Sequence, residues 1–227
     1  MKTLFLANLF ILALGAAATA DVVARYDFSA SSAASSDPDA NSTASAITVG
    51  AGFSSLTFST TWGNPAPSLS IVSSETDSPN TQGGAVTAND YITFTITPNV
   101  GTLSFSSLTV DLANFTTDGT FPTENFFLRS SRNSFASNIG GAVQVAASSN
   151  GAFTNAVFEL SGVAFQNIAV PVEFRLYVFD NTTNAARGAL IDNITVNTVP
   201  EPSTYAMLFG GAGLVFVVMR RKRLARA

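Results

Sequence analysis

Two stretches that alternate strictly between apolar residues and their neighbours constrain the fold of this chain most. Residues 91–97 read YITFTIT, with Ile92, Phe94 and Ile96 on one side and threonines between them. Residues 172–179 read VEFRLYVF and alternate in the same way. A period of two is typical of a strand with one buried face, and residues 21–198 sustain no helical period of 3.6. We therefore expect this part of the chain to be all-β.

Shorter alternating segments lie between clusters of turn-forming residues. The additional strands expected are residues 24–28, 55–60, 71–72, 103–112, 126–131, 142–145, 153–160 and 190–196. Residues 29–46 and 73–84 are rich in Ser, Asp, Asn and Gly, and we expect loops there. Many short strands separated by turn clusters predict one sandwich or barrel domain over residues 21–198.

The first 20 residues are typical of an export signal. Lys2 precedes an apolar run over residues 4–14, and small residues follow as Ala18-Thr19-Ala20. This is the arrangement that signal peptidase cleaves, so we expect the mature chain to begin at Asp21. The alternative is a buried N-terminal helix.

The last 29 residues, 199–227, form a second unusual segment. They begin as Val199-Pro200-Glu201-Pro202-Ser203 and continue uncharged from residue 203 to 219. As a helix, that uncharged run would span roughly 25 Å, near the lower limit for crossing a membrane. The basic cluster that follows consists of Arg220, Arg221, Lys222 and Arg223. The pattern predicts a transmembrane helix over 203–219 and a basic tail over 220–227, with the body outside the cytoplasm. The alternative is a buried helix of the soluble domain.

The composition excludes several functions. The chain has no Cys and no His, which removes disulfides, Ser-His-Asp and Cys-His catalysis and the usual zinc ligands. Residues 21–198 contain five arginines against fourteen acids, so this acidic body is not expected to bind nucleic acid. We expect no cofactor.

Residues 199–223 closely resemble the PEP-CTERM sorting signal of Gram-negative, biofilm-forming bacteria. The resemblance rests on three parts in the right order: the VPEPS motif, the apolar run and the basic cluster. It implies an inner-membrane anchor and recognition by an exosortase-type protease-transpeptidase. That enzyme would cut near Pro200-Glu201-Pro202 and deliver the body to the cell surface or extracellular matrix.

The body carries a looser resemblance. Residues 26–28 (YDF), 174–177 (FRLY) and 191–194 (IDNI) are similar to segments of β-sandwich ectodomains that accompany such tails, and the last recurs in jelly-roll carbohydrate modules. This resemblance implies an antiparallel β-sandwich ectodomain of jelly-roll type.

Exposed aromatic residues beside polar ones indicate candidate carbohydrate contacts. These are Trp62, Asn64, Tyr177 and Arg175, with Tyr91 as a further aromatic residue that alternation turns outward. Trp62 is the best single candidate, since it stands in a Gly-Asn-Pro loop. The alternative is that Trp62 folds back as a lid on the sandwich. For Arg175, the alternative is a cross-strand ion pair with Glu173 or Asp192.

Oxygen ligands in loops suggest a structural calcium ion as a candidate. We expect Asp27, Asp180 and Asp192 to lie at or near neighbouring strands in a jelly roll, and carboxylates suit this hard cation. The alternative is that these acids are solvated loop residues.

Three functions are compatible with these sequence features. The first is a structural or adhesive role in the envelope or exopolysaccharide, without catalysis. The second is a carbohydrate-binding module. The third is a glycan-active enzyme, which would need two carboxylates about 5–10 Å apart in a cleft.

Overall fold

The computed structural model describes residues 21–36, 39–73, 79–115, 123–146, 152–180 and 188–199. Asp21–Val199 forms one compact unit. The predicted signal peptide, the predicted transmembrane helix and the basic tail lie outside the described residues. Within the described ranges, no helix is long and apolar enough to span a membrane.

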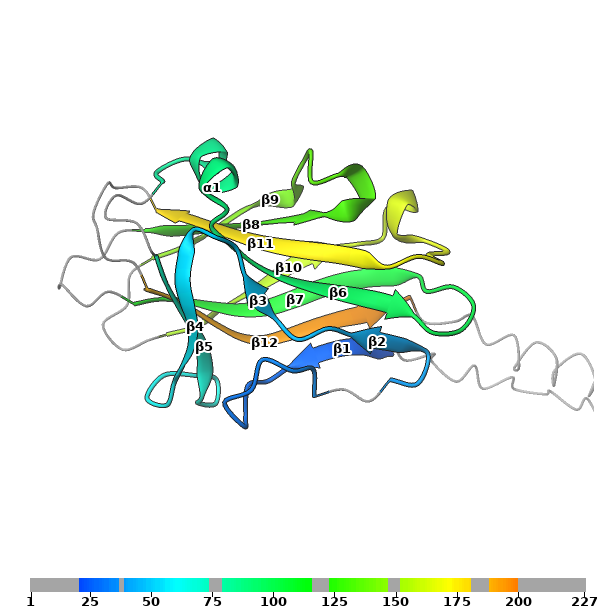
Figure 1. Ribbon diagram of the computed structural model, residues 1–227, viewed down its shortest axis with the longest axis horizontal. Helices are drawn as coiled ribbons and strands as arrows, with labels where there is room; N and C mark the ends of the chain where they lie inside the picture. The colour runs from blue at the N-terminus through cyan, green and yellow to red at the C-terminus, as the bar shows by residue number, and fades with distance from the viewer. Residues whose placement is uncertain are drawn as a thin grey trace, which may run out of the picture. The chain divides into compact units, whose positions relative to one another are not determined.

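The described residues form an all-β antiparallel sandwich of two sheets (Figure 1). Sheet A has the strand order β10-β7-β12-β5-β4, and β1 also pairs with β12. Its strands are β1 (Val22–Tyr26), β4 (Phe53–Ser59), β5 (Ser68–Ser73), β7 (Phe105–Phe115), β10 (Thr154–Glu159) and β12 (Gly188–Thr198). Sheet B has the order β2-β6-β11-β8-β9, and β3 also pairs with β6. Its strands are β2 (Ser42–Ala44), β3 (Thr48–Val49), β6 (Tyr91–Pro98), β8 (Glu124–Ser130), β9 (Ile139–Val145) and β11 (Val172–Asp180).

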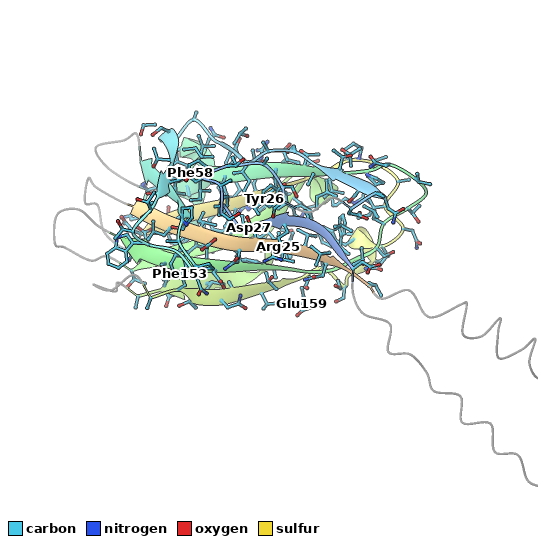
Figure 2. The ribbon with its side chains drawn as sticks, turned by 90° about the horizontal axis from the view of Figure 1, so that it is seen from below. Arg25, Tyr26, Asp27, Phe58, Phe153 and Glu159 are labelled. Carbon is cyan, nitrogen blue, oxygen red and sulfur yellow. The ribbon has the colours of Figure 1, made fainter. Side chains whose placement is uncertain are left out.

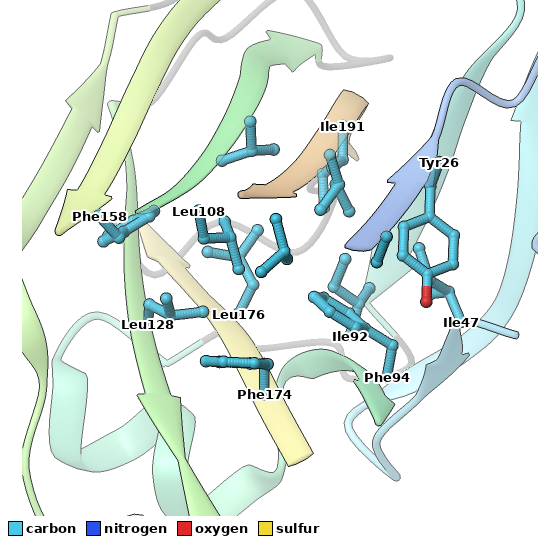
Figure 3. Packing of buried hydrophobic residues seen from close by; sticks show 14 of the residues in the cluster. Tyr26, Ile47, Ile92, Phe94, Leu108, Leu128, Phe158, Phe174, Leu176 and Ile191 are labelled. Atoms are coloured by element: carbon cyan, nitrogen blue, oxygen red, sulfur yellow. The ribbon is translucent and has the colours of Figure 1, made fainter. Parts of the chain in front are cut away.

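The core lies between the sheets and is built by the alternation that the sequence shows. Ile92 and Phe94 of β6 face Leu108 and Ile191 of sheet A (Figure 3), and Ile96 belongs to the same buried cluster. Every second residue of the paired strands enters this layer because successive strand side chains point to opposite faces. The two clearest strands of the sequence, β6 and β11, are direct neighbours in sheet B, with Phe94 opposite Phe174.

Strand ends differ from the sequence prediction where backbone geometry intervenes. The first strand was expected over residues 24–28, but it ends at Tyr26, and Phe28 adopts a left-handed φ of 53°. The expected loop 29–46 contains β2, which pairs with β6 through Thr43 opposite Thr97. The sequence pattern does not reveal this strand, because its residues are small and do not alternate between apolar and polar.

One short helix, α1 (Gln82–Ala88), begins inside a segment expected to be a loop. The Thr81 side chain caps its N-terminus by accepting a hydrogen bond from the Gly84 N–H, and Asn89 ends it in the left-handed conformation. Its seven residues are too few to display a helical period, which explains why pattern reasoning missed it. Two 3-10 turns, η1 (Ser131–Asn133) and η2 (Val163–Phe165), complete the described elements.

Candidate functional site

The outer face of sheet B carries a cluster of rings and guanidinium groups that we call the aromatic–arginine face. Its members are Tyr91 of β6, Phe127 and Arg129 of β8, Arg175 and Tyr177 of β11, and Phe135 from the loop that follows η1. Alternation along β6 and β11 turns these side chains away from the core, as the sequence predicts for Tyr91, Arg175 and Tyr177.

Arg175 is the centre of this face. Its guanidinium carbon lies 3.8 Å from the ring centroid of Phe135 and 4.6 Å from that of Tyr91, so the planar group is held by two rings. Its Nε donates a hydrogen bond of 2.7 Å to Glu173 Oε1. Glu173 also accepts a hydrogen bond from the Thr93 hydroxyl, which fixes the carboxylate on the sheet. Arg175 therefore pairs with Glu173, but within one strand, β11, and not across two strands as the alternative for it expected.

Arg129 ties the loop after η1 to the same face. Its Nη1 donates to the Phe135 carbonyl at 2.9 Å, and its Nε donates to Asn138 Oδ1 at 2.9 Å. Asn138 in turn donates to Gln82 Oε1 at the start of α1. Loop and helix are thereby connected above the sheet through one chain of hydrogen bonds.

Tyr177 lies on this face but is covered. Its ring stacks on Phe127 with 4.9 Å between centroids, and it packs with Ala85 of α1 in a small cluster separate from the main core. Tyr177 is 2 % exposed, whereas Tyr91 and Arg175 are half-buried and reach solvent. Tyr177 therefore supports the face from beneath, and Tyr91 and Arg175 form its accessible part.

Trp62 and Asn64 lie on the other sheet. They belong to the loop between β4 and β5, and Asn64 is held by Asp111 of β7 and Asp192 of β12. The four residues predicted as carbohydrate contacts thus divide into two pairs, Trp62 with Asn64 at sheet A and Arg175 with Tyr177 at sheet B. Trp62 is half-buried.

Two aspartates and three asparagines form what we call the Asp111–Asp192 network. Asp111 lies directly opposite Asp192 on the two adjacent strands β7 and β12. Asp192 Oδ2 accepts from the Asn64 N–H at 2.6 Å, and its Oδ1 accepts from the Asn193 N–H at 2.8 Å. Asp111 Oδ2 accepts from the side-chain amides of Asn64 and Asn193, both at 3.0 Å, and its Oδ1 accepts from Asn155 of β10 at 2.7 Å.

A β-bulge makes this arrangement possible. The register of β12 against β7 shifts between Asp192 and Thr195, and Asn193 takes a left-handed φ of 47°. The bulge aims the Asn193 amide at Asp111 and at the Asn64 carbonyl. Burial raises the pKa of Asp192, and the nearby carboxylates of Asp111 and Asp27 add to this, against the hydrogen bonds from Asn64 and Asn193.

The three acids predicted as calcium ligands are not gathered at one point. Asp27 follows β1, where Figure 2 shows it beside Arg25 and Tyr26, and its Oδ1 accepts hydrogen bonds from the N–H and hydroxyl of Ser29. These bonds, led by the one from the Ser29 backbone, lower the pKa of Asp27. Asp180 ends β11 in sheet B, whereas Asp192 lies in sheet A. In the part of the chain that the structure describes, no three acids are grouped to hold a metal ion.

Sequence reasoning missed Asp111, Asn193 and Phe135. Asp111 is a lone acid inside the alternating segment 103–112, at an outward position where a charge suggests only a solvated face. Its partners come from 44 to 82 residues away along the chain, a separation that no local pattern reveals. Phe135 stands in a polar turn, and only its contact with Arg175 gives it a role.

The sandwich continues to the edge of the C-terminal segment. Val199 is the last described residue before it, and its N–H donates a hydrogen bond of 2.8 Å to the Ser104 carbonyl. Pro200, Glu201, Pro202 and Ser203 follow outside the described residues. The fold and this junction define an all-β sandwich protein whose final strand leads directly into a C-terminal signal.

The comparisons identify that signal. Residues 198–223 match the family model described as the PEP-CTERM protein-sorting motif. The motif implies an exported, membrane-anchored surface protein. A comparison with curated proteins gives no match.

Several solved structures are similar to the sandwich at low identity. The CBM22-1 xylan-binding domain from Paenibacillus barcinonensis Xyn10C has 12% identity and a TM-score of 0.44, over 81% of this chain and 98% of that one. The mannan-recognising module TmCBM27 has 15% identity and a TM-score of 0.43, over 80% and 99%. The module CBM28, specific for non-crystalline cellulose, has 13% identity and a TM-score of 0.40, over 62% and 79%.

Proposed function

We propose that this protein is exported, anchored in the inner membrane by residues 203–219 and processed at Pro200-Glu201-Pro202 by an exosortase-type enzyme. The released or re-attached sandwich then serves a structural or adhesive role in the cell envelope or exopolysaccharide. Signal peptidase would first remove residues 1–20.

The observation that carries this proposal is the direct junction between sandwich and motif. The matched motif begins at residue 198, and Val199 is still bonded to the sandwich through Ser104. Pro200 and Pro202 lack the N–H groups needed to extend a strand or helix, which favours an extended, accessible backbone. A protease acting there would remove the tail while leaving β12 complete.

The Asp111–Asp192 network supports a non-catalytic role. Each carboxylate oxygen of this pair accepts a hydrogen bond from an asparagine, and the two side chains are buried beneath the Trp62 loop. A glycosidase pair needs one carboxylate free to meet substrate and another to donate a proton. Here the pair holds a loop in place instead.

The experiment follows processing in the native host. Pro200 and Pro202 are replaced together by Ala, and the full chain is followed by immunoblot of membrane and surface fractions. We expect the variant to accumulate in the membrane fraction at the larger, unprocessed size. Thr204→Ala, which leaves both prolines and the Val199–Ser203 segment unchanged, is the matched control and should be processed normally. Normal processing of the double proline variant would overturn the proposal.

A second candidate function is carbohydrate binding at the aromatic–arginine face. The half-buried ring of Tyr91 beside the fixed guanidinium of Arg175 supports it, since sugars pack on aromatic faces and accept hydrogen bonds from planar donors. Affinity electrophoresis in a panel of polysaccharides tests it. Binding lost in Tyr91→Ala but kept in Trp62→Ala assigns the site to sheet B, and the reverse assigns it to the Trp62 loop. A wild type that no polysaccharide retards would contradict this candidate.

A further inference from the structure

One end of the sandwich, which we call the terminal end, gathers both ends of the body and two loops. Its parts are the loop 98–104 between β6 and β7, the segment 160–171 before β11, Asp21 and Val199. Asp21 belongs here because its carbonyl accepts a hydrogen bond from the Thr198 N–H. Figure 1 shows β6 and β12 ending at this end, and β1 and β11 beginning there.

Hydrogen bonds join these parts into one surface. The backbones of Leu103 and Ile168 exchange a pair of bonds at 2.9 and 2.7 Å. The Ser104 carbonyl accepts from the Val199 N–H, and the Ser104 hydroxyl accepts from the Asn167 N–H. Val199 therefore lies against the same two loops, one residue before the proline-containing motif.

The two loops are free of charge and present apolar side chains to solvent. Residues 98–104 read PNVGTLS and residues 160–171 read LSGVAFQNIAVP, without an acid or base. Val100 is 72 % exposed, Val163 90 % and Val170 51 %. These are three of the five large apolar side chains that are exposed among the described residues, and Val199 is the fourth. Charged residues near these loops are Arg132, which bonds to the Ala164 carbonyl, Asp21, and Glu159, which is labelled in Figure 2.

The length of chain beyond Val199 limits how far this surface can lie from the membrane. Only residues 200–202 separate Val199 from the uncharged segment 203–219. An extended chain spans at most about 3.5 Å per residue, so the start of that segment lies within roughly 15 Å of Val199. While the tail is inserted, the terminal end is the part of the sandwich closest to the bilayer surface.

We propose that the terminal end is a lipid-contact surface, at which Val100, Val163 and Val170 enter the membrane interface in the anchored precursor. This inference rests on the proposed function, because it requires residues 203–219 to be inserted. The acidic body would be repelled by anionic headgroups, whereas two charge-free loops meet them without that penalty. Exposed valines gain from the transfer to the interface, since burial of apolar surface is favourable. The contact also orients the sandwich and presents the scissile segment at the membrane face.

Because the chain contains no Cys, a single introduced cysteine can be labelled at one chosen position. The full chain is made with single cysteines at Val163→Cys, Val170→Cys or Val157→Cys, labelled with an environment-sensitive dye and reconstituted into phosphatidylethanolamine–phosphatidylglycerol vesicles. Val157 lies on β10, outside both loops, and its 51 % exposure equals that of Val170, so it is the matched control. Flotation of the vesicles first reports insertion, and quenching by spin-labelled lipids then reports depth.

We expect blue-shifted emission and at least twofold stronger lipid quenching at positions 163 and 170 than at 157. Equal quenching at all three positions in floated protein would overturn the lipid contact while leaving the anchor intact. Protein that fails to float would overturn the anchor itself. Protection of positions 163 and 170 only when an exosortase-type enzyme is added would also overturn the proposal, because the surface would then be a protein contact.

Discussion

The carboxylate of Asp192 accepts a hydrogen bond of 2.6 Å from the backbone N–H of Asn64, a residue 128 positions earlier in the chain. This bond joins the loop that carries the one tryptophan of the protein to the central strand of sheet A. The hydrogen bond therefore indicates a structural role for Asp192. It also makes Trp62 a fluorescent reporter of the Asp111–Asp192 network.

Removal of the Asp111 carboxylate should release the Trp62 loop. Asp111→Ala leaves the side-chain amides of Asn64, Asn155 and Asn193 without their shared acceptor. Because hydrogen bonds to a charged group contribute about 1.5–3 kcal/mol, we expect unfolding free energy to fall by roughly that amount or more. Urea unfolding followed by Trp62 emission measures this loss. Glu159→Ala, an exposed acid on β10, should change it by less than about 0.5 kcal/mol.

The raised pKa of Asp192 predicts a particular dependence of stability on pH. The unfolded group titrates near 3.8, whereas burial makes the folded group hold its proton to higher pH. The folded state thus binds more protons above pH 3.8, and this contribution to stability falls as pH rises through the folded pKa. Urea unfolding between pH 3.8 and 7 should show a smaller decline in Asp192→Asn than in wild type. An identical slope in both proteins would contradict this assignment.

The pKa of Asp27 is shifted in the opposite direction, so the effect of this residue on stability serves as the comparison. Hydrogen bonds from Ser29 lower its pKa, so its contribution is present above the unfolded value of 3.8 and is lost as pH falls below it. Asp27→Asn should therefore alter the acid limb below pH 3.8 and leave the slope above it unchanged. The two variants separate the two carboxylates in the same experiment.

Much of the fold could be predicted from the sequence because alternation is a local property. The segments YITFTIT and VEFRLYVF became β6 and β11 with their inward and outward residues as expected. The helix α1 and strand β2 could not be predicted in this way. The helix α1 depends on the cap at Thr81, and the strand β2 depends on its pairing with β6. Neither interaction produces an apolar pattern in the sequence.

The candidate site was only partly predictable, for a different physical reason. Alternation shows that Tyr91, Arg175 and Tyr177 point outward, but it cannot show that α1 covers Tyr177. It also cannot show that Asn64 and Arg175 lie on different sheets, since strand order depends on contacts between distant segments. The jelly-roll connectivity stays a prediction that rests on short sequence segments.

Substitution of Arg175 should loosen the loop after η1. Arg175→Lys keeps the charge but loses the planar group that Phe135 and Tyr91 hold, and contacts of this kind contribute about 0.5–2 kcal/mol. We expect a loss of about 1 kcal/mol in unfolding free energy and faster amide hydrogen exchange in residues 131–138. Arg25→Lys on the exposed side of β1 is the control, and exchange unchanged in both variants would contradict the role of the stacked guanidinium.

Tyr26 offers a test of the core. Its ring is fully buried and its hydroxyl donates a hydrogen bond of 2.7 Å to the Ser45 carbonyl, and burial raises its pKa well above the ordinary value. Tyr26→Phe should cost about 0.5–1.5 kcal/mol, because the hydrogen bond to the Ser45 carbonyl is lost. Tyr91→Phe, at a half-buried position, should cost less. Equal costs in thermal or urea unfolding would show that the buried hydroxyl contributes nothing specific.

The position of β12 in sheet A ties the order of synthesis to the order of folding. β12, the last strand in the described part of the chain, pairs with β1, β5 and β7, so the first described strand and two later ones gain this partner only when it is present. Until residues 188–198 are available for pairing, sheet A lacks its central strand. In the proposed export route, the sandwich would therefore close only after residues 188–198 have been translocated, and a chain halted before that point would present unpaired strands to the secretion machinery.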